Sequence, residues 1–464
     1  MFDLERIARI VDGDFSGRKV NCQLSGISTD SRNLSPGTLF VPLRGEHFDG
    51  HDYLGQAVKN GAAACLSEEV TSGLSVPVVR VSNTLRALGD IAATYRLQLN
   101  GPLVAITGSA GKTTTKEMLA TILEQVAPGL KTAGNFNNLI GLPLTLFRLE
   151  QKHQWAVLEM GTSALGEIER LTEIAQPTIG VVTNIGEAHL ETLQGLDGVS
   201  RAKGELFAGL QGGTAIINLD DYRVAQLPVA NGVKKLTYGL SEQADVRAES
   251  LMDKDKGVSF DLILAGQRYP VQLSLPGRHN VFNALAAAAA AMEIHVPAEK
   301  IVVGLTRFIT IQGRMDLFPL PCGGLLLDDS YNSNPLSACV ALDALLSLSG
   351  SGRRVAVLGD MLELGVNSVR LHEELGAKAA KVVDLLIGVG QFSADLCRGA
   401  EAAGMQPAQM TAVADAAAAI KYLHEQQHSG DKILLKGSRG VHLEQVAEAL
   451  KTTVDTPANG KKGN

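Results

Sequence analysis

Cysteine is scarce in this 464-residue sequence, which holds five cysteines and no C-x-x-C pair. This usage excludes the paired spacing of a zinc knuckle and the dense disulfide framework of a small secreted domain. We expect the cysteines to behave as small buried hydrophobic residues. They are Cys22, Cys65, Cys322, Cys339 and Cys397.

Basic residues are neither in excess nor clustered. The chain has 42 Lys and Arg residues against 49 Asp and Glu residues, for a net charge of −7, and it contains no run rich in lysine or arginine. Proteins that bind nucleic acid usually carry a basic patch or stripe. The composition therefore predicts that nucleic acid is not a partner.

Long hydrophobic runs are missing as well. The most apolar stretch is NVFNALAAAAAAMEIHV, residues 280–296, which is too short and too polar at both ends to cross a bilayer. We expect an alanine-rich helix packed closely against a sheet. The first residues carry acids among apolar side chains, without the basic segment and apolar core of a signal peptide. These features predict a cytoplasmic protein without membrane insertion.

The length exceeds what one hydrophobic core normally supports, and three regions differ in pattern. Residues 1–100 mix short apolar runs with turn-rich pieces, which predicts a small mixed α/β domain. Residues 101–312 alternate apolar strands with helical segments, which predicts a doubly wound parallel sheet, with a more β-rich segment at about 236–275. Residues 313–464 repeat the alternation, with strands predicted at 324–330, 354–361, 384–390 and 432–438. The polar tail 455–464 is expected to be disordered. The fold class is α/β.

A glycine-rich turn, ITGSAGKTTTKEM, follows the first strand of the middle region at residues 106–118. Two residues separate Gly108 from Gly111, whereas the usual phosphate-binding loop has four. The two glycines still allow backbone N–H groups to close on phosphate oxygens at a helix N-terminus. Lys112 would supply a cation to the phosphates and Thr113 a hydroxyl to magnesium.

Polar residues follow the next strands of the same region. In parallel sheets ligands bind at the carboxyl ends of the strands, and Glu159 ends one strand as a candidate magnesium ligand. The alternative is an acid that faces solvent. His189 follows another strand and is either a ligand or an ordinary histidine. Lys203 is either a solvated lysine paired with Glu205 or a nearby acid, or a carbamate that binds magnesium, and spacing alone does not decide between them.

Amide-rich segments provide further candidates. Asn135, Asn137 and Asn138 lie in a loop that could hold phosphate or a substrate carboxylate, although turn chemistry also explains them. Asn280 and Asn283 lie at a helix start, where they could cap the helix or bind an adenine edge. Arg314, at a domain junction, could reach nucleotide phosphates from a neighbouring domain.

Several motifs occur together in a fixed order along the chain: STDSRNLSPGTLFVPLRGEHFDGHDY, TGSAGKTTTKEM, GNFNNLIGLPLTL, LEMGTSALGEIERL, TNIGEAHLE, RAKGELF, GRHNVFNALAA, GRMDLF and DDSYNSNP. In this order the chain resembles the Mur ligases over nearly its whole length. The resemblance implies an ATP-dependent, amide-forming enzyme of bacterial cell-wall synthesis. It also implies a UDP-sugar-binding domain at 1–100, a central ATP-binding domain at 101–312 and a Rossmann-like domain for the incoming amine at 313–464. The shortened loop is typical of this family.

The resemblance also implies roles for individual residues. The expected catalytic residues are Lys112, Glu159, His189 and Lys203, and the magnesium ligands are Thr113, Glu159, His189 and carbamylated Lys203, with two ions expected. The expected nucleotide-binding residues are Gly108, Ser109, Ala110, Gly111, Lys112, Thr113, Thr114, Asn280, Asn283, Arg314 and Asp329. The expected substrate-binding residues are Ser28, Asp30, Ser31, Arg32, Asn137, Asn138, Tyr331, Asn332 and Asn334. A tight turn capped by Asp30 and Ser31 is the alternative explanation of the first part of the substrate set.

The signature DDSYNSNP, residues 328–335, narrows the expected substrates. It resembles the family member that joins D-alanyl-D-alanine to UDP-N-acetylmuramoyl-tripeptide, and GDMLELG followed by His372 fits the same member. Two alternatives remain at this point. Folylpolyglutamate synthetases share the shortened loop but lack such an N-terminal domain, and a catalytically silent protein could use ATP for regulation. We expect a monomer.

Overall fold

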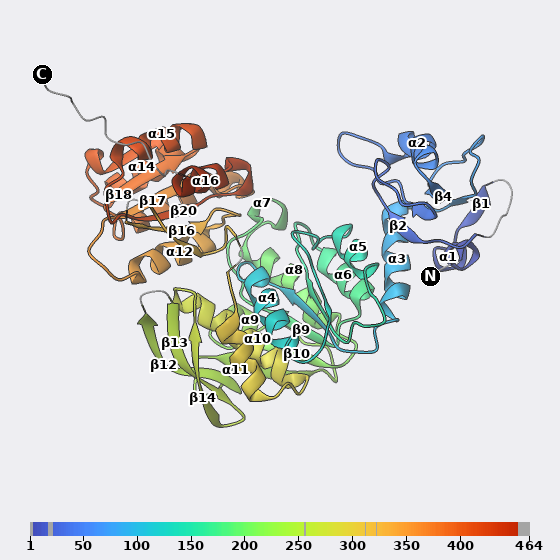
Figure 1. The fold of residues 1–464 in the computed structure, drawn as a ribbon, viewed down its shortest axis with the longest axis horizontal. Helices are drawn as coiled ribbons and strands as arrows, with labels where there is room; N and C mark the ends of the chain where they lie inside the picture. The colour runs from blue at the N-terminus through green and yellow to red at the C-terminus, as the bar shows by residue number, and fades with distance from the viewer. Residues whose placement is uncertain (1–2, 17–21, 255–256, 311, 322, 453–464) are drawn as a thin grey trace, which may run out of the picture.

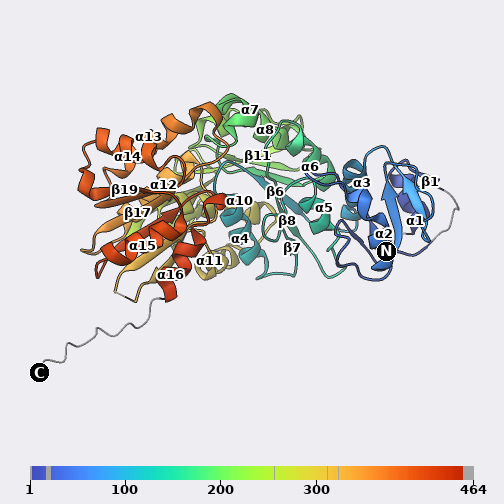
Figure 2. The same ribbon diagram turned by 90° about the horizontal axis from the view of Figure 1, so that it is seen from above.

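The computed structural model describes residues 3–16, 22–254, 257–310, 312–321 and 323–452. Three sheets follow one another along the chain, and the sheet of residues 103–273 lies between the other two (Figures 1 and 2). Cys322 and the tail predicted to be disordered lie outside the described residues.

The N-terminal sheet has five short strands in the order β1-β5-β4-β3-β2. β2, β3, β4 and β5 are parallel neighbours, and β1 is antiparallel to β5. The prediction of a small mixed α/β unit is confirmed here. Its elements are α1 (Leu4–Ile10), β1 (Asp14–Ser16), β2 (Gly26–Ser28), β3 (Thr38–Phe40), η1 (Gly50–Tyr53), α2 (Leu54–Lys59), β4 (Ala62–Ser67), β5 (Val78–Arg80) and α3 (Thr84–Arg96).

The central sheet has nine strands in the order β14-β13-β12-β11-β10-β9-β6-β8-β7. It is parallel from β7 to β12 and antiparallel from β12 to β14. The strands are β6 (Leu103–Thr107), β7 (Leu130–Lys131), β8 (Ala156–Glu159), β9 (Ile179–Val182), β10 (Thr214–Asn218), β11 (Lys234–Gly239), β12 (Val246–Lys254), β13 (Gly257–Leu264) and β14 (Gln267–Leu273).

Helices cover both faces of the parallel part. From β6 the chain runs to β7 at the sheet edge, comes back to β8 beside β6, and then crosses to β9 on the other side of β6. Right-handed connections in the two directions place their helices on opposite faces. α10 packs against α4 and against β11, β12 and β13, and its alanines are fully buried, as the sequence predicts. The helices are α4 (Lys112–Leu123), α5 (Gly141–Leu146), α6 (Glu167–Ala175), α7 (Leu190–Leu193), α8 (Leu196–Ala208), α9 (Tyr222–Ala225), α10 (Arg278–Glu293) and α11 (Ala298–Arg307).

The C-terminal sheet has six strands in the order β15-β16-β20-β17-β18-β19, all parallel except β15. The strands are β15 (Asp316–Pro319), β16 (Leu325–Asp329), β17 (Arg354–Gly359), β18 (Leu385–Val389), β19 (Met410–Val413) and β20 (Lys432–Lys436). The helices are α12 (Pro335–Ser347), η2 (Gly365–Asn367), α13 (Ser368–Ala379), α14 (Ser393–Ala402), η3 (Pro407–Gln409), α15 (Ala416–Gln426), η4 (Arg439–Val441) and α16 (Glu444–Thr452). The sequence predicted four of these strands and missed β15 and β19.

Helix α3 joins the N-terminal sheet to the central part of the molecule. Arg96, at its last turn, is 7% exposed, and its guanidinium donates to the carbonyl oxygens of Ala175 (2.7 Å) and Gln176 (3.2 Å). These carbonyls end α6, so the arginine satisfies orphan acceptors at a helix C-terminus. Tyr95 adds an edge-to-face ring contact with Phe147. Helix α3 therefore packs on the central region as well as on its own sheet.

Among the helices of the described ranges, none is long and apolar enough to cross a membrane.

Candidate active site

The phosphate-binding loop links the end of β6 to the start of α4. Gly108 and Gly111 have φ angles of 149° and 81°, and Gly111 is the N-cap of α4. A Cβ on Gly111 would lie 2.3 Å from Asn283 Oδ1, so both its left-handed backbone and its close neighbour require glycine. The Lys112 ammonium donates to the Gly108 carbonyl (2.8 Å). Burial lowers the pKa of Lys112, and the nearby Glu159 carboxylate opposes that shift.

Glu159 lies at the carboxyl end of β8 and is 3% exposed, so the alternative of a solvent-facing acid is wrong. Its two carboxylate oxygens accept hydrogen bonds from the Thr113 hydroxyl (2.8 Å) and the Asn137 amide (2.9 Å). A carboxylate beside a hydroxyl next to a phosphate-binding loop is the oxygen donor set that magnesium prefers. These residues therefore fit a magnesium ion and a nucleotide.

The loop that carries Asn137 combines both roles considered for it. Asn138 accepts hydrogen bonds from the backbone N–H groups of Ile140 (3.2 Å) and Gly141 (2.8 Å), which is turn chemistry. Asn137 instead holds Glu159 and lines the cavity described below. Turn formation therefore explains one of the two asparagines and not the other.

Lys203 lies on α8 and is 2% exposed. The predicted alternative of a solvated lysine paired with Glu205 is wrong, because the Glu205 carboxylate accepts from the N–H groups of Gly166 (2.8 Å) and Glu169 (3.1 Å). Burial, with a smaller contribution from the Lys112 charge, lowers the pKa of Lys203 well below its ordinary value. A lowered pKa favours the neutral amine, which is the form that reacts with carbon dioxide.

His189 connects the central part to the C-terminal part of the chain. It has a φ angle of 52° directly before α7, and its Nδ1 pairs with the Glu363 carboxylate. This hydrogen bond lowers the pKa of Glu363. Within the described ranges, no three His, Cys, Asp or Glu side chains already form a metal-binding group. The structure therefore gives His189 a carboxylate partner and leaves its role as a ligand a prediction.

Asn280 and Asn283 do not cap α10, whose N-cap is Gly277 without a side-chain hydrogen bond. The Asn280 amide donates to the Pro276 carbonyl (2.8 Å), and the Asn283 amide donates to Asn280 Oδ1 (3.2 Å). The two amides therefore brace each other beside Gly111. The capping alternative is wrong.

Arg314 and the segment after β16 form the opposite wall. The Arg314 guanidinium lies 4.1 Å from the centre of the Tyr331 ring, which is a cation–π contact. Asp329 forms an ion pair with Lys436 (2.8 Å) and accepts from the Met315 N–H (3.1 Å). Burial raises the pKa of Asp329 despite the Lys436 charge.

Asn334 spans the two walls. Its side-chain oxygen accepts from the Ser337 N–H (2.8 Å) and so caps α12, while its amide donates to the Ser109 carbonyl (3.1 Å) of the phosphate-binding loop. Beside it, the Leu336 side chain packs against Gly186 so closely that a Cβ on Gly186 would lie 2.7 Å from Leu336 Cδ2. The C-terminal part therefore touches the central part directly at the loop.

These groups enclose one cavity of about 1080 Å³. Gly108 is not among the lining residues. The predicted residues that line the cavity are Ser109, Ala110, Gly111, Lys112, Thr113, Thr114, Asn135, Asn137, Asn138, Glu159, His189, Lys203, Asn280, Asn283, Arg314, Asp329, Tyr331, Asn332 and Asn334. Residues from two of the three sheets thus meet at one site, as expected from strand ends in parallel sheets.

The predicted N-terminal residues do not line this cavity. Asp30 accepts from the backbone N–H of Arg32 (2.9 Å) and pairs with its guanidinium (2.8 Å), which holds the pKa of Asp30 at about 2. The Ser28 hydroxyl accepts from the Asp30 N–H (3.1 Å). The tight-turn alternative therefore describes the local geometry, and binding of the UDP group of the substrate by Ser28, Asp30, Ser31 and Arg32 stays a prediction.

Lys436 is a functional candidate that the sequence analysis missed. It ends β20, is 3% exposed, and donates to the Asn332 carbonyl as well as to Asp329. The signal was a lysine directly after the apolar run of the strand KILLK, where a buried ammonium needs a partner.

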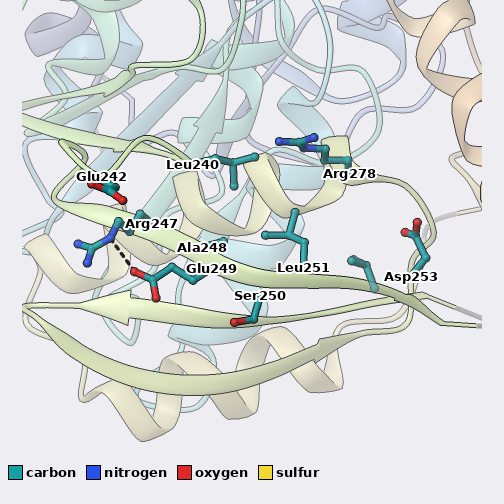
Figure 3. A pocket seen from close by; sticks show the side chains of 10 residues that line it. Leu240, Glu242, Arg247, Ala248, Glu249, Ser250, Leu251, Asp253 and Arg278 are labelled. Atoms are coloured by element: carbon teal, nitrogen blue, oxygen red, sulfur yellow. Dashed lines mark hydrogen bonds and ion pairs between the residues drawn. The ribbon is translucent and has the colours of Figure 1, made fainter.

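A second cavity of about 510 Å³ lies between β12 and the start of α10 (Figure 3). Its charged groups include Glu242, Arg247, Glu249 and Arg278, and Arg247 pairs with Glu249 (3.2 Å). It contains none of the predicted site residues.

Comparisons with known proteins agree with this architecture along the whole chain. Residues 23–96 match the catalytic domain description of the Mur ligase family, residues 106–291 match the Mur ligase middle domain, and residues 313–439 match the Mur ligase glutamate ligase domain. The chain therefore belongs to the Mur ligase family.

Within the family, the similar proteins carry one name. The chain is 39% identical over 454 residues to the UDP-N-acetylmuramoyl-tripeptide--D-alanyl-D-alanine ligase of Escherichia coli, covering 97% of this chain and 98% of that protein. It superposes on crystal structure I of MurF from Acinetobacter baumannii with a TM-score of 0.89, at 34% identity, covering 96% and 98% of the two chains. MurF from Thermotoga maritima in complex with ADP gives a TM-score of 0.82 at 28% identity, covering 92% and 97%.

Proposed function

We propose that the protein is an ATP-dependent, ADP-forming ligase that joins D-alanyl-D-alanine to UDP-N-acetylmuramoyl-tripeptide. The observation that carries the proposal is the shared cavity, where the loop of α4, Glu159 and Thr113 face Arg314, Tyr331 and Asn334 of the DDSYNSNP side. The relatives that match nearly the full chain are ligases of this name. The product would be the pentapeptide precursor of peptidoglycan.

The chemistry requires activation of a carboxylate, because oxide is a very poor leaving group. ATP phosphorylates the tripeptide carboxylate, and the dipeptide amine then attacks the acyl phosphate and displaces phosphate. The Lys112 ammonium and the N–H groups of the loop stabilise charge on the transferred phosphoryl group and hold it in line. Glu159 and Thr113 would hold magnesium, which lowers the repulsion between carboxylate and triphosphate.

Lys203 has a role in this scheme as a carbamate. The two negative reactants meet in one cavity, and a second magnesium ion needs a further anionic ligand there. Lys203 is buried and has no hydrogen-bond or ion-pair partner among the described residues. It lies close enough to Lys112 for the Lys112 charge to lower its pKa. A carbamate on Lys203 would turn an unfavourable buried cation into that ligand.

The three parts of the chain would divide the substrates. We propose that residues 1–100 bind the UDP group through Ser28, Asp30, Ser31 and Arg32, that residues 101–312 bind ATP, and that residues 313–464 bind the dipeptide. The N-terminal set lies outside the cavity. Closure of the N-terminal part over the cavity would complete the site and keep water from the acyl phosphate. We propose a monomer that acts in the cytoplasm.

The test is phosphate release from ATP by the purified protein with UDP-N-acetylmuramoyl-tripeptide and D-alanyl-D-alanine, omitting each in turn. Release is expected only when all three are present, with formation of the pentapeptide in equal amount. Release that ignores the dipeptide would contradict the assignment. Folylpolyglutamate synthetase activity is the enzyme alternative, and glutamate with a folate in place of the two substrates should give no release.

A further inference from the structure

Lys116 is a buried lysine that the proposed mechanism does not use. It lies in the first turns of α4, one helical turn after Lys112, and is 1% exposed. Its ammonium donates to the Thr132 carbonyl (2.7 Å) and pairs with the Glu117 carboxylate (2.8 Å). A buried ammonium is unfavourable unless its donors are satisfied, so the contacts of Lys116 are specific and fixed.

Thr132 contacts both Lys116 and Glu159. Its hydroxyl accepts the backbone N–H of Glu159 (3.0 Å), and its own N–H donates to the Val157 carbonyl (3.1 Å). Thr132 directly follows β7, so its side chain extends the pairing of β7 with β8 to the last residue of β8. The position of the Glu159 backbone therefore depends on where Thr132 is held.

The amide loop holds Glu159 by separate contacts. The Asn137 amide holds one Glu159 oxygen, and the Asn137 carbonyl accepts the N–H of Gly161 (2.8 Å), just after Glu159. This loop begins shortly after Thr132. The Lys116 ammonium, which belongs to the helix of the phosphate-binding loop, thus connects that helix through Thr132 to the Glu159 backbone, while Asn137 holds the carboxylate from the other side.

We propose that Lys116 is a positioning residue that sets the Glu159 carboxylate against the Thr113 hydroxyl for a divalent cation. The proposal rests on the assignment of Glu159 as a magnesium ligand in the proposed function. Lys112 and Lys116 then have different roles on the same helix. Lys112 contacts phosphate, and Lys116 positions the Glu159 carboxylate that binds the metal ion.

The experiment measures the calorimetric Kd of ADP with excess magnesium and again with EDTA. The variant is Lys116→Met, and the matched control is Lys131→Met, because Lys131 pairs with the same Glu117 (2.7 Å) but has a 36% exposed side chain and holds neither Thr132 nor Glu159. We expect Lys116→Met to weaken ADP binding about tenfold in magnesium and to leave it unchanged in EDTA. Lys131→Met should leave both values unchanged.

Thr132→Val provides a second route if Lys116→Met does not fold, as judged by circular dichroism. It keeps the carbonyl that Lys116 holds and removes the hydroxyl that holds the Glu159 N–H. The same magnesium-specific loss is expected. The inference would be overturned if ADP affinity fell equally with and without magnesium, or if it fell in neither variant. The proposed function would still stand in that case, provided that ADP binding by the wild type depends on magnesium. A wild type that binds ADP equally in magnesium and EDTA would overturn both.

Discussion

Asn334 offers a prediction in which stability and activity separate. Its side-chain oxygen caps α12, and its amide donates to the Ser109 carbonyl of the phosphate-binding loop. Alanine removes both contacts, whereas aspartate is an equally good cap but lacks the donor. The pair Asn334→Ala and Asn334→Asp therefore tests the two atoms of one side chain independently.

The magnitudes follow from these two contacts. Loss of the cap costs about 1 kcal/mol of stability, which corresponds to a decrease of about 3 °C in the melting temperature of a domain this size. Loss of the amide bond to the loop is a single hydrogen bond of about 1 kcal/mol, or about fivefold in kcat/KM. We expect Asn334→Ala to lose stability and activity, and Asn334→Asp to lose activity with a melting temperature close to that of the wild type.

Scanning calorimetry and steady-state phosphate release provide the two readings. ADP affinity, measured separately, should fall in both variants, because the amide contacts the loop that holds phosphate. If Asn334→Asp keeps wild-type activity, the contact with Ser109 has no part in the reaction. If only the KM for D-alanyl-D-alanine rises and ADP affinity is unchanged, Asn334 acts as a dipeptide contact and the reasoning from the loop is refuted.

Three further predictions concern the site. Lys203→Ala should abolish phosphate release, with partial recovery on adding acetate or propionate; a fully active variant would remove the carbamate. Gly111→Ala should weaken ADP binding at least tenfold, because the φ of 81° and the 2.3 Å approach to Asn283 both oppose a Cβ; unchanged affinity in calorimetry would contradict this. Burial, aided by the Lys436 charge, lowers the pKa of His279 from 6.5 to about 4. The contribution of His279 to the free energy of unfolding should thus be fully present above pH 6.5 and should decrease as the pH falls towards 4. The melting temperature of His279→Gln should decrease less than that of the wild type between these pH values.

Local chain signals were enough to predict the phosphate-binding loop, the strand that ends at Glu159 and the alanine-rich helix. Glycines at fixed spacing and an acid at a strand end report chemistry within a few residues. Burial of Lys203 does not have such a signal. Lys203 has an acid two positions later in the sequence and could be read as solvated, yet the structure turns Glu205 towards the start of α6 and buries the amine.

Contacts between distant segments could not be predicted either, because local sequence patterns carry no signal for them. The Lys116 contact with Thr132, the Lys436 pair with Asp329 and the bond from Asn334 to Ser109 join residues far apart in the chain. Short edge strands such as β15 and β19 were missed because four residues carry little periodicity. The relative position of the N-terminal residues also depends on packing that no local pattern encodes.

The contact of Arg96 with the end of α6 determines which N-terminal fragments of the protein can be prepared alone. A fragment that stops at residue 100 would keep α3 and the Leu99 carbonyl that Arg96 contacts (3.1 Å), but it would lose the carbonyls of Ala175 and Gln176. Two guanidinium contacts would then be missing, and an apolar helix face would be exposed to water. Such a fragment should aggregate, whereas one that extends through the whole central part, to the end of α11, should remain monomeric. The smallest N-terminal piece that can be prepared alone is therefore larger than the one that the sequence delimits.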